Sequence, residues 1–195
     1  LELDSYVAPL LDDVGITYVL AGSDFQADSG DAAGSANINN IISVIKGAGY
    51  STMDGFLFAG DYSVGATKSS NVAALKNTIK TAYPELTDEQ MVLIQGNHDN
   101  SASYTDAEAG LVGSVLNNSG ANDAGSYGVY VINEKDYNWK GKNENLVKQT
   151  AADLDNYLDA KRNAGYTKPI FVVSHLPLNY NMRTLNDGDG MYANY

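Results

Sequence analysis

Four short apolar runs, separated by segments of helical periodicity, constrain the fold of this chain more than any other sequence feature. The runs span residues 16–20, 55–59, 91–94 and 169–173, and each is too short for a helix and rich in β-branched or aromatic residues. Runs of this kind are typical of strands that are buried on both faces of a sheet. A fifth run at 127–132 indicates a further strand.

Helical patterns fill the intervals between these runs. Apolar residues recur at three- and four-residue steps in three segments, which carry Ile38, Ile41, Ile42 and Ile45; then Val72, Leu75 and Ile79; then Val147, Ala151, Leu154 and Leu158. Pro84 stops the second segment, and Gly165 follows the third. The alternation of strands with helices predicts an α/β fold with at least partly parallel strand pairing.

The composition limits the classes of function that the chain can have. Its 195 residues, 44% of them hydrophobic, fit one globular domain over residues 1–195. Twelve Lys and Arg against 24 Asp and Glu give a net charge of −12, which argues against nucleic-acid binding. No apolar run approaches the roughly 18 residues that a membrane span needs. Richness in Gly, Asn, Ser and Tyr favours an exported bacterial protein.

Polar residues with metal-binding or proton-transfer chemistry follow each of the four runs. They are Asp24 and Gln26 after the first, Asp61 after the second, Asn97, His98 and Asp99 after the third, and His175 after the fourth. Asp24 or Asp61 alone is more typical of a turn and His175 alone of an ordinary histidine, whereas the Asn97-His98-Asp99 block is more specific. Both histidines of the chain fall in this set. Because ligands gather outside the carboxyl ends of strands in α/β sheets, we expect one common site. Without cysteine, its donors are oxygen and imidazole, which suit Mn, Fe, Zn or Mg.

The blocks Asp24-Phe25-Gln26, Gly60-Asp61, Gly96-Asn97-His98-Asp99 and Ser174-His175 resemble, in order, the D-x-H, G-D, G-N-H-D/E and H motifs of the calcineurin-like metallophosphoesterases. The resemblance implies a sandwich of two mixed β-sheets flanked by helices. It also implies hydrolysis of phosphate mono- or diesters at a dinuclear metal centre by a metal-bound hydroxide. The substrate would be a small phosphoester or an exposed phosphorylated group.

The same resemblance implies a role for each residue of the site. Asp61 would bridge two divalent or trivalent ions, most suitably Mn, Fe or Zn, with Asp24 and Gln26 on the first ion and Asn97 and His175 on the second. His98 would protonate the leaving alkoxide or stabilise charge on the phosphoryl group, and Asp99 would orient the imidazole of His98.

Two departures from the family pattern leave an alternative open. Gln26 stands where the family has a histidine, and an amide oxygen is a weaker ligand than imidazole. The later G-H-x-H motif is absent, so we expect a domain that is incomplete at its C-terminus, with partial metal and low activity. The alternative is a catalytically silent member of the fold that serves as a binding or cell-surface module. A nucleotide-binding domain is disfavoured, because no G-x-G-x-x-G or P-loop pattern occurs.

Overall fold

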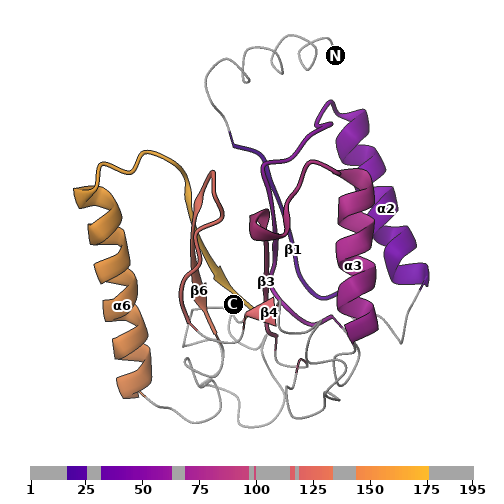
Figure 1. Cartoon of the computed structure of the whole chain (residues 1–195). Helices are drawn as coiled ribbons and strands as arrows, with labels where there is room; N and C mark the ends of the chain where they lie inside the picture. Colours follow the sequence, from indigo (N-terminus) through magenta and orange to yellow (C-terminus); the bar gives the residue numbers. More distant parts are fainter. Residues whose placement is uncertain are drawn as a thin grey trace, which may run out of the picture.

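Two β-sheets face each other in the computed structural model, which describes residues 17–25, 32–62, 69–96, 99, 115–116, 119–133 and 144–175 (Figure 1). The first sheet has the order β1-β2-β3-β4 and is parallel throughout, with strands Val19–Gly22, Gly55–Phe58, Met91–Ile94 and Val115–Leu116. The second has the order β5-β6-β7, with strands Gly120–Ala121, Gly128–Ile132 and Ile170–Ser174. In this sheet β5 is antiparallel to β6, whereas β6 and β7 are parallel.

Helices cover the outer face of each sheet. Helices α2 (Ala32–Gly47) and α3 (Ser69–Ala82) lie on the first sheet, and α6 (Glu144–Asn163) lies on the second (Figure 1). A short helix, η1 (Asp88–Gln90), leads into β3. The expected α/β sandwich of two sheets flanked by helices is confirmed. In the part of the chain that the structure describes, no helix has the length and apolar character that crossing a membrane requires.

Alternate residues of the central strands face two separate cores. On β2, Phe56 and Phe58 point toward the helices, whereas Leu57 points toward the second sheet. The helix-side core also contains Ile42, Val72, Leu75, Ile79, Tyr83 and Leu93, and the inter-sheet core contains Val92, Ile94, Val129, Val131 and Val173. Since burial of one such side chain stabilises the fold by about 1.5–3 kcal/mol, these two cores fix the sheets against each other and against the helices.

The burial of the strands differs from the sequence prediction at the sheet edges. Burial on both faces is confirmed for β2 and β3, whose residues are all buried. It is wrong for β1, whose residues are half-buried or exposed, and for β7, where Val172 is 41% exposed. Among the described strands, β1 and β7 each pair on one side only, so a neighbour covers less of their surface.

The predicted apolar stripes of two helices also need correction. On α2, Ile42 is buried and Ile38 and Ile45 pack beside it, but Ile41 is 57% exposed. Ile41 therefore lies outside the helical face that meets the sheet, although its spacing fits the stripe. On α6, Ala151 is exposed.

Tyr127 lies fully buried between the two sheets. Its ring meets Phe171 edge to face with centroids 5.5 Å apart, and its hydroxyl donates a hydrogen bond to the Gln90 carbonyl at 2.7 Å. Burial raises the pKa of Tyr127 to about 12, because the charged phenolate would lose its hydration. This residue therefore joins the second sheet to the segment that enters β3.

The Tyr127→Phe variant is expected to lose less stability than the wild type as the pH rises into the alkaline range. The unfolded chain releases this proton near pH 10, whereas the folded chain keeps it until about pH 12, so the free energy of unfolding falls across that window. Urea denaturation from about pH 9 to pH 11 should show a shallower fall for the variant than for the wild type. Parallel curves would contradict this account.

At neutral pH, the same variant should lose about 1 kcal/mol of stability through the lost hydrogen bond. Tyr83→Phe is the matched control, because the buried Tyr83 hydroxyl has no hydrogen-bond partner among the described residues. Its removal should leave the free energy of unfolding unchanged or increase it.

Candidate metal centre

The strands that run parallel within each sheet end at one edge of the sandwich, the lower edge in Figure 1. Of the seven residues predicted for the site, the structure describes Asp24, Asp61, Asp99 and His175. Gln26, Asn97 and His98 lie outside the described residues. The edge therefore contains at least one residue from each of the four predicted strand ends.

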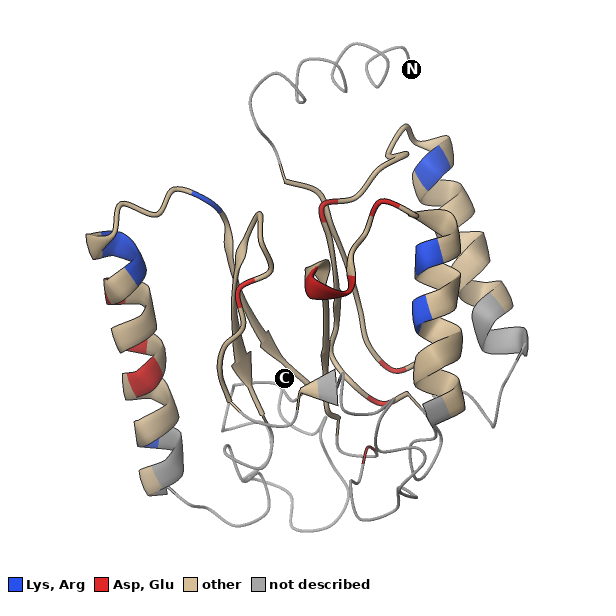
Figure 2. Cartoon of the chain, in the orientation of Figure 1, with Lys and Arg blue, Asp and Glu red and all other residues tan. Residues whose placement is uncertain are grey.

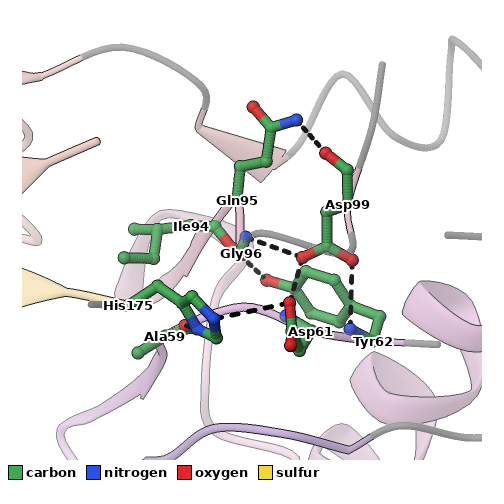
Figure 3. Close-up of polar contacts among 8 residues, drawn as sticks. All are labelled: Ala59, Asp61, Tyr62, Ile94, Gln95, Gly96, Asp99 and His175. Carbon is green, nitrogen blue, oxygen red and sulfur yellow. Dashed lines mark hydrogen bonds and ion pairs between the residues drawn. The ribbon is translucent and has the colours of Figure 1, made fainter. Parts of the chain in front are cut away.

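Asp61 and His175 approach each other although they are far apart in sequence (Figure 3). Nε2 of His175 lies 3.5 Å from Oδ1 of Asp61, and both side chains are almost fully buried. The other ring nitrogen of His175, Nδ1, donates a hydrogen bond to the Ala59 carbonyl at 2.6 Å. This bond fixes the ring and joins β7 of the second sheet to the loop after β2 of the first.

The tautomer set by Ala59 makes the Asp61–His175 pair suitable for a cation. With the proton on Nδ1, a neutral His175 presents the lone pair of Nε2 to a carboxylate oxygen. Two lone pairs facing each other are favourable only with a proton or a metal ion between them. Two donors that share an ion at about 2.1 Å in tetrahedral geometry lie roughly 3.4 Å apart, and a backbone carbonyl on the second ring nitrogen is usual for metal-binding histidines. The pair therefore fits a metal ion.

Asp24 joins this edge through its backbone. Its N–H donates to the Gly60 carbonyl at 2.9 Å, directly before Asp61, and its side chain is exposed. Both Asp24 and Asp61 have left-handed backbone conformations, with φ of 57° and 60°, which non-glycine residues adopt rarely and often at functional sites. Within the described ranges, no three His, Asp or Glu side chains are grouped closely enough to hold a metal ion.

The carboxylate of Asp99 is buried and accepts hydrogen bonds from three backbone amides. Oδ2 accepts from Gly96 and from Asp61, both at 2.7 Å, and Oδ1 accepts from Tyr62 at 3.1 Å (Figure 3). Burial raises the pKa of Asp99, and the three amides oppose that rise only in part. The expected contact of Asp99 with the His98 ring stays a prediction, because His98 lies outside the described residues.

Two glycines allow the loops after β2 and β3 to touch. Gly60 has φ of +94°, and a Cβ there would lie 2.4 Å from the Gly96 nitrogen. A Cβ on Gly96 would lie 2.3 Å from Oδ1 of Asp61. A larger residue at position 96 would push the Asp61 carboxylate away from its place beside His175, and one at position 60 would push the two loops apart.

Sequence reasoning missed two buried polar residues at this edge. Gln95, the first residue after β3, donates a hydrogen bond from its side-chain amide to the Asp99 carbonyl. Asn133 directly follows β6, and the register of β6 with β7 pairs Ile132 with Ser174, so Asn133 lies next to His175 along the edge. The strand-end rule that identified His175 would also have identified Asn133 had it been applied to the fifth strand.

The described loops at this edge are acidic. They carry Asp24, Asp61 and Asp99, and none of their described residues is Lys or Arg; the basic residues that the structure describes lie on the helices and at the opposite end (Figure 2). A phosphate ester would be repelled here unless cations reverse the local charge. The charges of the described residues at this edge therefore agree with a metal site.

Gly96→Ala is expected to lower the free energy of unfolding by about 1–3 kcal/mol, because the new Cβ would overlap the Asp61 carboxylate. Gly22→Ala is the matched control at the end of β1, where a Cβ would meet Phe58 at an ordinary contact distance of 3.5 Å. Urea denaturation compares the two variants. Equal stability of both would show that the loops do not approach as closely as described.

A known protein family matches the sequence of this chain. The sequence profile of the family described as "Calcineurin-like phosphoesterase" matches residues 9–193. No match was found among curated proteins. The profile covers nearly the whole chain, and the paired sheets and the Asp61–His175 contact fit the fold and motif order that the sequence resembles. The chain therefore belongs to the calcineurin-like phosphoesterase family.

Proposed function

We propose that this chain is a metal-dependent hydrolase of phosphate mono- or diesters that works with two metal ions. The observation that supports this most is the orientation of His175. Its Nδ1 proton is engaged by the Ala59 carbonyl, so that Nε2 faces the Asp61 carboxylate across 3.5 Å in a loop region that contains three aspartates and no described Lys or Arg. A buried donor pair of this kind is suited to a cation.

The proposed ligand set follows the family motifs. Asp61 would belong to both ions, Asp24 and Gln26 to the first, and Asn97 and His175 to the second. Mn, Fe or Zn suits these oxygen and imidazole donors. When bound, the two ions would activate water as the nucleophile and neutralise charge on the phosphoryl oxygens.

The chain's own residues would supply orientation and the proton. The Ala59 carbonyl holds the His175 ring in one tautomer, so that its Nε2 lone pair points into the site. The Asp99 carboxylate holds the backbone of Asp61. His98 would give a proton to the departing alkoxide, since an imidazole has a pKa close to working pH.

Asp61→Asn is expected to reduce hydrolysis of aryl phosphate mono- and diesters with Mn²⁺ by about 100-fold or more, because the shared carboxylate is lost from both ions. Mn²⁺ affinity, measured by isothermal titration calorimetry, should fall in parallel. The measurement compares wild type and variant at saturating substrate and several Mn²⁺ concentrations.

Asp159→Asn is the matched control, since Asp159 is an exposed carboxylate on α6 that pairs with Arg162 at 2.7 Å. Its Mn²⁺ affinity and hydrolysis should equal those of the wild type. Wild-type protein that binds Mn²⁺ but hydrolyses neither kind of ester would contradict the hydrolase and support the silent binding module. Equal activity of Asp61→Asn and wild type would refute the metal assignment of Asp61.

A further inference from the structure

We infer that Asp99 is a positioning residue whose carboxylate fixes the backbone of Asp61 and thereby places the Asp61 carboxylate opposite His175. The family resemblance assigns Asp99 to the His98 ring instead. The claim that Asp99 affects metal binding rests on the proposed function. The claim that Asp99 fixes the Asp61 backbone rests on the hydrogen bonds alone.

The first observation is that the Asp99 carboxylate fixes both peptide groups that flank the Cα atom of Asp61. The N–H of Asp61 donates to Oδ2 and the N–H of Tyr62 donates to Oδ1, at 2.7 and 3.1 Å. Consecutive amides that converge on one anion form a nest, which requires a left-handed residue in the turn. Asp61 is that residue, with φ of 60°.

The second observation is that Asp99 is itself held on the central strand. Its carboxylate accepts the Gly96 N–H at 2.7 Å, and its carbonyl accepts the side-chain amide of Gln95, which is 3% exposed. The Gln95 backbone N–H donates to Leu116 on the neighbouring strand at 2.9 Å. These hydrogen bonds fix Asp99 relative to β3, so that its carboxylate can hold the loop after β2 in place.

The third observation concerns the energy of this arrangement. Burial of a carboxylate at 1% exposure is unfavourable unless hydrogen bonds replace its hydration. A left-handed conformation at a non-glycine residue adds backbone strain. Charge-assisted hydrogen bonds from three amides offset part of this combined cost. Without the Asp99 charge, the left-handed conformation of Asp61 would be less stable. That conformation directs the Asp61 side chain to His175.

The two roles of Asp99 differ in their measurable consequences. If Asp99 orients the His98 ring, its loss slows esters with poor leaving groups more than esters with good ones, as the loss of a general acid does. If Asp99 positions Asp61, its loss weakens metal binding and slows all esters to a similar extent. It also exposes the amides of Gly96, Asp61 and Tyr62 to exchange with water.

The experiment compares wild type with Asp99→Asn, and uses His98→Gln as the reference for loss of the acid. The Asn side chain has nearly the same shape, but its one oxygen is neutral and a weaker acceptor, and its NH₂ group would oppose either the Tyr62 N–H or the N–H groups of Gly96 and Asp61. Amide hydrogen exchange of metal-free protein should be about tenfold faster or more at Gly96, Asp61 and Tyr62, and unchanged in β6. Mn²⁺ affinity should fall about tenfold or more, with equal slowing of good and poor leaving groups.

Unchanged exchange at those three amides in Asp99→Asn would overturn the inference. It would also be overturned if Asp99→Asn bound Mn²⁺ as tightly as the wild type and showed the same leaving-group dependence as His98→Gln. Wild-type protein that binds no Mn²⁺ would refute the proposed function, while the exchange measurement would still decide the backbone role of Asp99.

If Asp99→Asn does not fold, Gln95→Met takes its place, because it removes only the bond to the Asp99 carbonyl. Faster exchange at Asp61 in that variant supports the inference, and unchanged exchange overturns it.

Discussion

The hydrogen bonds from Gly96, Asp61 and Tyr62 to the buried carboxylate of Asp99 join the loops after β2 and β3, and the rest of the candidate centre depends on them. The loops can meet only because Gly60 and Gly96 have no side chains at the point of contact. Two further bonds extend the connection, from the Asp24 amide to Gly60 and from the His175 ring to Ala59. Residues from β1, β2, β3 and β7 are thereby held at one edge by backbone and side-chain hydrogen bonds.

The two cores of the sandwich provide the frame for this edge. Because β2 and β3 are buried on both faces, their ends cannot shift without disturbing either the helix-side core or the inter-sheet core. The inter-sheet core also determines how near β7 comes to β2, and hence the distance between His175 and Asp61. Packing far from the edge therefore controls the geometry of the proposed metal ligands.

Much of this architecture could be predicted from local sequence pattern. Short β-branched runs located β1, β2, β3, β6 and β7, but not the two-residue strands β4 and β5. The strand-end rule predicted that Asp61 and His175 share one edge, and they do, although β2 and β7 belong to different sheets. The direction in which side chains point was less predictable. Ile41 fits the helical stripe yet is exposed, because the width of the buried face of α2 depends on how the helix packs against the rest of the fold. The backbone amides that donate to Asp99, and the hydrogen bond from Gln95 to the Asp99 carbonyl, could not be predicted, because they depend on how the chain folds in space. The metal-binding and catalytic roles of all seven site residues, and the extent of the domain, remain predictions from the sequence.

The most direct test of the central claim is anomalous diffraction from crystals of the chain soaked in Mn²⁺. The account predicts a manganese peak bonded to both the Asp61 carboxylate and Nε2 of His175, at about 2.0–2.3 Å from each. The Nδ1 hydrogen bond to Ala59 should be retained, since it directs Nε2 toward the ion. Manganese found only at exposed carboxylates, with Asp61 and His175 still facing each other and no peak between them, would contradict the account.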